Sequence, residues 1–186
     1  MEEAEEAVRP LRELGEPAVD LSGPMPFVEA QQVFDPEYPD GRRYYWKSTY
    51  LSELDSATCE LLDRYAASRP SKLSSIDVWA LGGAMREEPA GGSAFARRDQ
   101  PFLIGIEANW DDPGGDEENL RWARDLYAEL SERSRDGVYL NFAGLGEEGE
   151  DLLRASFGES YDRLREIKGK YDPENVFRSN LNIPPT

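Results

Sequence analysis

A strongly apolar run from Phe102 to Trp110 limits this chain to folds that bury a β-strand. Two other runs predict strands: residues 42–51, which are aromatic and polar by turns, and residues 74–81, whose pattern suits a strand buried on both faces. Gly82-Gly83 then predicts a tight β-hairpin turn. A short fourth strand is predicted over 138–142. The sequence therefore predicts a sheet with hairpin chemistry near its middle.

Helical patterns separate these runs. Asp55 is a suitable N-cap for a helix through Arg69, and residues 116–132 place apolar side chains at helical spacing. Further helices are predicted over residues 2–14, 150–157 and 159–170, the last two parted at Gly158. Strands and helices in this order predict an α+β fold, an antiparallel sheet flanked by helices with a helical C-terminal tail. If residues 2–14 form a crossover helix, the strand expected before it is absent, and one edge of the sheet is left open for pairing.

The charge balance disfavours nucleic acid and membrane surfaces as partners. Thirty-eight acidic against 21 basic residues give a formal net charge of -17, which repels phosphate backbones. Only Lys47, Lys72, Lys168 and Lys170 are lysines, and mean hydropathy is -0.70. Acid excess with scarce lysine is typical of proteins from salt-loving organisms. We therefore expect a halophilic protein that loosens in low salt.

Missing residue types exclude several kinds of chemistry. Cys59 is the only cysteine and there is no histidine, so an internal disulfide, a cysteine zinc cluster and a histidine-activated nucleophile are excluded. We predict no metal site. The acidic N-terminus does not resemble a signal peptide, and no apolar stretch approaches membrane-spanning length, so the cytoplasm is the expected location.

Three stretches carry a family resemblance. The first is Gly41-Arg42-Arg43-Tyr44-Tyr45-Trp46-Lys47-Ser48. The second joins Val78-Trp79-Ala80-Leu81-Gly82-Gly83-Ala84 to Ala94-Phe95-Ala96-Arg97-Arg98-Asp99. The third and most specific runs from Tyr139-Leu140-Asn141-Phe142 through Phe157-Gly158-Glu159-Ser160-Tyr161 to Lys168-Gly169-Lys170-Tyr171-Asp172-Pro173. Together they resemble the berberine bridge enzyme-like FAD-linked oxidoreductases of the vanillyl-alcohol-oxidase and para-cresol methylhydroxylase superfamily.

The resemblance covers the substrate side of those enzymes. It implies a partial substrate-binding domain over residues 1–137 and a berberine-bridge-type C-terminal segment over 138–186, packed as one unit. The complete enzymes use FAD to oxidise an alcohol or amine carbon by hydride transfer. No glycine-rich phosphate loop follows a strand here. We therefore expect the flavin-binding domain to be absent from this chain, and the chain by itself to retain no FAD and to be inactive.

The same resemblance implies roles for particular residues. Tyr139 falls at the position whose phenol lies by the flavin and removes the substrate proton in some relatives, and Asn141 would face the cofactor. An ordinary phenol, with a pKa of about 10, is a poor base at neutral pH, so such a site must assist it. Independently of the resemblance, Tyr45, Asp77 and Trp79 lie on predicted strands and are candidates to line the substrate, Asp77 and Trp79 from the same side of their strand. For all five, ordinary packing is the alternative interpretation. Arg97 stands where relatives carry histidine, so no role of that histidine is transferred.

Two other interpretations remain open. The chain is either half of a split enzyme whose flavin-binding domain comes in cis or in trans, or a binding or dimerisation module that kept the fold without the chemistry. An open sheet edge would serve either the flavin-binding partner or a homo-oligomer. A neighbouring reading frame for the flavin half favours the split enzyme. A colourless, stable homodimer favours the module.

Overall fold

The computed structural model describes residues 2–16, 20, 22–134, 137–144, 149–178 and 181–186. The chain divides into two compact units, an N-terminal unit of residues 1–40 and a sheet unit of residues 41–186. Within the described residues no helix is both long and apolar enough to cross a bilayer. The predicted division at residue 137 is a different boundary and stays a prediction.

The N-terminal unit consists of short helices. Helix α1 spans Glu2–Arg12, α2 spans Phe27–Gln31 and the single-turn 3-10 helix η1 spans Asp35–Glu37. Arg12 links the unit internally, because its guanidinium pairs with Glu5 at 2.6 Å and with Asp20 at 2.7 Å. None of the described residues of these helices is buried.

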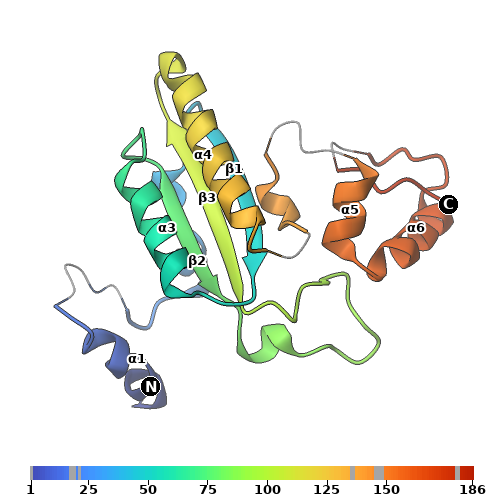
Figure 1. The fold of residues 1–186 in the computed structure, drawn as a ribbon. Coiled ribbons are helices and arrows are strands. Elements are labelled where there is room, and N and C mark those ends of the chain that lie inside the picture. The colour runs from blue at the N-terminus through green and yellow to red at the C-terminus, as the bar shows by residue number, and fades with distance from the viewer. Residues whose placement is uncertain (1, 17–19, 21, 135–136, 145–148, 179–180) are drawn as a thin grey trace. The chain divides into compact units, whose positions relative to one another are not determined.

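The sheet unit contains a three-stranded antiparallel sheet in the order β1-β3-β2. Strand β1 is Arg43–Leu51, β2 is Ser75–Ala80 and β3 is Phe102–Trp110. The apolar β3 lies in the centre, and both other strands lie at edges among the described residues (Figure 1). The antiparallel α+β prediction is therefore confirmed.

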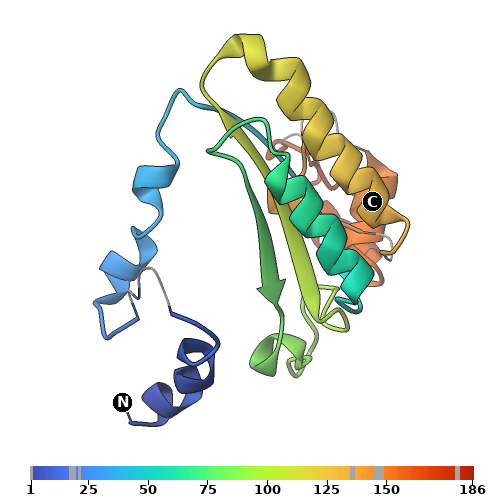
Figure 2. The ribbon, with the colours of Figure 1, turned by 60° about the vertical axis from the view of Figure 1, so that its left-hand side comes forward.

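Two helices cover one side of the sheet, here called the helix face. Helix α3 spans Ser56–Ala67 and α4 spans Asp116–Ser131, and Figures 1 and 2 show both lying across the same side. As predicted, Asp55 caps α3, accepting a hydrogen bond from the Thr58 amide at 2.7 Å. The core between sheet and helices consists of Tyr45, Leu51, Leu61, Ile104, Ile106, Ala108, Trp110, Trp122, Ala123, Leu126 and Leu130.

Two predictions around β2 are wrong. The strand is not buried on both faces, because Val78 and Trp79 each leave 48% of their surface exposed. Gly82-Gly83 does not turn the chain into a hairpin; residues Gly83–Arg86 form the 3-10 helix η2. Strand β2 instead pairs with β3, and the long connection 81–101 joins the two strands. Gly83, at φ +54°, bends the chain at this point but does not reverse its direction.

The C-terminal part of the sheet unit is helical, as predicted. Helix α5 spans Glu150–Phe157 and α6 spans Ser160–Tyr171, and Gly158 separates them with φ +53°. Asp172 ends α6: its carboxylate pairs with Lys168 and accepts the amides of Val176 at 2.8 Å and Phe177 at 3.0 Å. The Lys168 hydrogen bond, followed by the amides, lowers the pKa of Asp172.

Candidate functional site

The candidate site lies on the other side of the sheet, here called the open face. Strand alternation brings to this face Ser48 and Tyr50 of β1, Asp77 and Trp79 of β2, and Leu103 and Gly105 of β3. Residues 137–144, here called the Tyr139 loop, lie against it. The Phe142 ring lies over Gly105, where a Cβ would make ordinary contacts at 3.5 Å with that ring and 3.6 Å with Asp77.

The Tyr139 loop is not the predicted strand. Leu140–Phe142 form the 3-10 helix η4, closed by a hydrogen bond from the Phe142 amide to the Tyr139 carbonyl at 2.8 Å. Among the described residues the loop pairs with no strand, because side-chain hydroxyls form the hydrogen bonds with its backbone amides and carbonyl. The pattern of residues 138–142 was apolar enough for a strand, but it carried no information about that competition.

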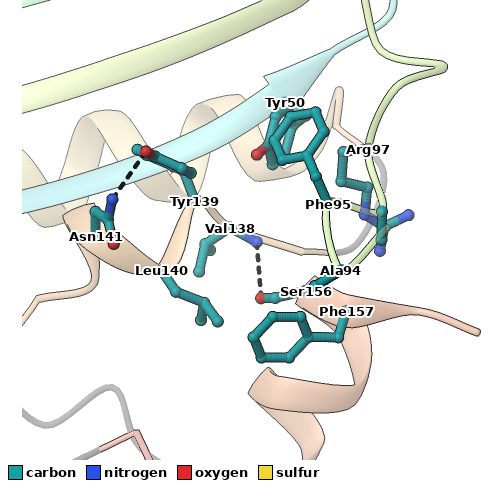
Figure 3. Close-up of a pocket in the computed structure, with 11 residues that line it drawn as sticks. Tyr50, Ala94, Phe95, Arg97, Val138, Tyr139, Leu140, Asn141, Ser156 and Phe157 are labelled. Carbon is teal, nitrogen blue, oxygen red and sulfur yellow. Dashed lines mark hydrogen bonds between the residues drawn. The ribbon is translucent and has the colours of Figure 1, made fainter. Parts of the chain in front are cut away.

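A buried serine fixes the backbone of Tyr139. The Ser48 hydroxyl accepts a hydrogen bond from the Tyr139 amide at 2.9 Å and donates one to the Tyr139 carbonyl at 3.2 Å. Ser48 is fully buried, so water does not replace these bonds. Next along the chain, the amide of Val138 donates to the Ser156 hydroxyl of α5 at 3.3 Å (Figure 3). The loop is thus held from both β1 and α5.

Tyr139 and Asn141 converge. The Asn141 side-chain amide donates to the Tyr139 hydroxyl at 2.8 Å, and Figure 3 shows the two side chains turned toward each other. In the predicted strand, Asn141 would project to the same side as Tyr139; the observed 3-10 turn also brings the two side chains together. The Tyr139 ring is fixed by an edge-on contact with Phe142, with centroids 5.3 Å apart. In this pair Asn141 is the donor and the Tyr139 oxygen is the acceptor.

Two cavities meet at Tyr139. The larger, about 480 Å³, is lined by Tyr50, Trp79, Ala80, Leu81, Met85, Phe95, Leu103, Tyr139, Asn141 and Phe142. The smaller, about 240 Å³, is lined by Tyr50, Ala94, Phe95, Ala96, Arg97, Val138, Tyr139, Leu140, Asn141, Ser156 and Phe157. Tyr50, Phe95, Tyr139 and Asn141 border both. The arrangement is an apolar, aromatic hollow with few polar groups, as is usual for small-molecule sites.

The two tyrosines of this hollow differ in their surroundings. Tyr50 is 2% exposed, and burial, with a smaller contribution from Tyr139, raises its pKa to about 12 despite the opposing charge of Arg97. Tyr50 therefore stays a neutral phenol at physiological pH. Tyr139 is half-buried and reaches the cavity mouth beside the exposed Asn141.

The other predicted residues separate into two groups. Trp79 lines the larger cavity and Asp77 lies on the same face two residues away. The structure does not bring Tyr45 to them: it lies on the helix face, 4% exposed, where its hydroxyl accepts a hydrogen bond from Arg124 at 3.2 Å. The assigned roles of all five residues remain predictions.

Sequence reasoning missed Ser48, Tyr50, Phe95 and Leu103. Alternation places Ser48 and Tyr50 on one face of β1, which is a usable signal. It does not say which face of an aromatic strand the helices cover. Phe95 comes from the long connection before β3, and only tertiary structure places it beside Tyr139.

The helix face carries a separate charged feature. Lys47 is 5% exposed, and its ammonium lies 4.0 Å from the centre of the Tyr127 ring. Burial, and then the charge of Arg124, lower the pKa of Lys47 to about 8. This group is on the opposite side of the sheet from Tyr139.

Comparisons with known proteins show which sequences and folds the chain is similar to. Residues 138–184 match the family described as "Berberine and berberine like". The chain is 30% identical over 185 residues to the uncharacterized FAD-linked oxidoreductase YgaK of Bacillus subtilis, covering 98% of this chain and 40% of that protein. It is 37% identical over 171 residues to berberine bridge enzyme-like 17 of Arabidopsis thaliana, covering 81% of this chain and 31% of that protein.

Solved structures share the fold. The crystal structure of aclacinomycin oxidoreductase superposes with a TM-score of 0.75 at 23% identity, over 100% of this chain and 42% of that one. The chain thus spans well under half the length of the proteins it matches. Through residues 138–184 and its similarity to part of these proteins, the chain is a relative of the berberine bridge enzyme-like FAD-linked oxidoreductases, as its motifs predicted.

Proposed function

We propose that this chain forms the substrate side of an FAD-linked oxidoreductase that oxidises an alcohol or amine carbon. The observation that carries the proposal is the Asn141–Tyr139 hydrogen bond of 2.8 Å, set at the mouth of an aromatic hollow on the open face. The family match over residues 138–184 covers the same segment.

The residues on this face fit contact with one side of a flavin ring. Trp79, Phe142 and Leu103 offer flat or apolar surface, and Tyr139 and Asn141 offer a hydroxyl and an amide at its border. Such a donor set suits a planar heteroaromatic ring. Gly114-Gly115 precede α4, but Asp116, Glu117 and Glu118 in the first turn of that helix repel a pyrophosphate. The proposal therefore assigns pyrophosphate binding to another part of the enzyme.

When bound, FAD would accept the hydride from the substrate carbon. The task left to this chain is the proton. Tyr139 lies where it could take the proton of a substrate hydroxyl or amine, and the hydrogen bond donated by Asn141 fixes the position of its oxygen. Tyr50, whose pKa of about 12 keeps it a neutral phenol, would not act as the base.

Reconstitution tests the proposal. The chain is co-expressed with a flavin-binding region, either one encoded beside it or one from the YgaK relative, and the purified complex is examined by visible absorption. We expect flavin absorption in a complex that contains both parts, and its loss when this chain is omitted. A chain that never associates with a flavin-binding region and purifies as a colourless homodimer would refute the proposal in favour of a binding or dimerisation module. In that case an edge strand, β1 or β2, is the surface we would expect to pair.

A further inference from the structure

The smaller cavity contains a charge that the proposed chemistry does not use. Of the described residues that line either cavity, only Arg97 carries a formal charge at neutral pH. Arg97 comes from the connection between β2 and β3, and Figure 3 shows it across the smaller cavity from Tyr139 and Asn141. No carboxylate among the described lining residues neutralises it.

The Arg97 guanidinium is held by the backbone and keeps spare donors. One terminal nitrogen donates to the Ala155 carbonyl at the end of α5. The group packs on Gly137, where a Cβ would come within 2.8 Å of it. Its Nε is buried and has no hydrogen-bond acceptor among the described residues. Guanidinium has five N–H donors in a fixed fork, so this anchoring leaves donors for a planar anion.

The position of Arg97 relative to the aromatic hollow indicates which end of a ligand would lie in which cavity. Its positive charge acts on the Tyr50 phenol, which borders both cavities. Beyond Tyr139 the larger cavity is lined by Trp79, Met85 and Leu103, with no charged residue among those described. Tyr139 thus lies between a cationic compartment and an apolar one.

We propose that Arg97 forms an anion subsite that selects substrates with a carboxylate on one side of the reacting carbon and an apolar body on the other. The carboxylate pairs with Arg97 in the smaller cavity, the body fills the larger one, and the reacting hydroxyl or amine lies at Tyr139. This inference rests on the proposed function for the reaction, but binding at the subsite does not require a flavin. Hydroxy and amino acids with large apolar side chains have this shape.

The net charge of -17 does not oppose this assignment. Exposed carboxylates elsewhere are screened beyond about 8 Å at physiological salt, whereas a contact between an anion and a part-buried guanidinium is not. A bidentate pair with Arg is among the strongest charge-assisted contacts in proteins. Local charge therefore decides the preference of the cavity.

The test compares two probes of nearly the same shape, the anionic 3-phenyllactate and the neutral 3-phenyllactamide. Each is titrated into the flavin-free chain, and dissociation constants are measured by NMR chemical-shift changes of the Tyr139 and Asn141 signals. We expect the carboxylate to bind about tenfold more tightly than the amide. Arg97→Gln should reduce this ratio to near one, while Arg97→Lys, which keeps the charge but not the fork, should keep part of it.

Arg121→Gln is the matched control, since it removes the same charge from an exposed side chain of α4. It should leave the ratio unchanged. Circular dichroism checks that each variant is folded; if Arg97→Gln is not, the partial loss of the ratio expected for Arg97→Lys replaces it. A wild-type ratio near one, or a ratio unchanged by Arg97→Gln in a folded chain, overturns the anion subsite. Neither result depends on flavin reconstitution, so the two proposals fail separately.

Discussion

Ser48 allows a quantitative test of how the Tyr139 loop is held. Replacing it with alanine removes the acceptor of the Tyr139 amide at 2.9 Å and the donor to the Tyr139 carbonyl at 3.2 Å. Each intramolecular hydrogen bond contributes about 1 kcal/mol net, and an unsatisfied buried group costs about 1–3 kcal/mol. We therefore expect Ser48→Ala to lower the free energy of unfolding by about 2 kcal/mol, measured by urea denaturation.

Amide hydrogen exchange gives the local measurement. A loss of about 2 kcal/mol in local protection corresponds to roughly 30-fold faster exchange of the Tyr139 amide. Ser160→Ala is the matched control, because the Ser160 hydroxyl donates a similar bond of 3.0 Å to the Ser93 carbonyl. It should lower stability without exposing the Tyr139 amide. If exchange at Tyr139 is the same in Ser48→Ala as in wild type, Ser48 does not hold the loop.

Three further predictions concern pH, backbone geometry and salt. Because the pKa of Lys47 is lowered to about 8, the folded state binds fewer protons than the unfolded state above that pH. The free energy of unfolding should therefore rise from pH 8 to about 10, above which the tyrosines whose pKa is raised to about 12 have the opposite effect. Urea titrations should show this rise in the wild-type chain and not in Lys47→Met. Gly137→Ala places a Cβ 2.7 Å from the Ala155 carbonyl at a residue with φ +111°, whereas Gly149→Ala, at φ +124°, places its Cβ in open space. Gly137→Ala should therefore lower the free energy of unfolding by about 1 kcal/mol or more beyond the loss in Gly149→Ala. Equal losses in the two variants would show that backbone strain alone matters. The melting temperature should rise between low and multimolar salt, because about 1 M salt reduces the Debye length to about 3 Å and screens the repulsion between acidic side chains. An unchanged melting temperature would contradict halophilic adaptation.

Much of the fold follows from the sequence because its signals are local. The Asp55 cap, the apolar β3 run and the Gly158 break each depend on neighbouring residues only, and all three appear as predicted. The Gly82-Gly83 turn was wrong because two glycines permit a bend without specifying which strand follows.

The candidate site shows where local reasoning stops. Tyr139 and Asn141 were identified by family resemblance, and they do meet, but through a 3-10 turn that depends on the distant Ser48. Tyr45 was grouped with Trp79 because both are strand aromatics. Only the placement of α3 and α4 decides that Tyr45 lies in the core while Trp79 lines the cavity.

The contact between the open face and a flavin is tested most directly by NMR of the reconstituted complex with tyrosine labelled at Cζ. The Tyr139 signal is assigned with Tyr139→Phe, and the flavin is then reduced chemically without any substrate. The proposed function predicts that the Tyr139 signal shifts as the visible flavin absorption bleaches, while Tyr171, 74% exposed, does not move. A Tyr139 signal that stays in place while the flavin bleaches would contradict it.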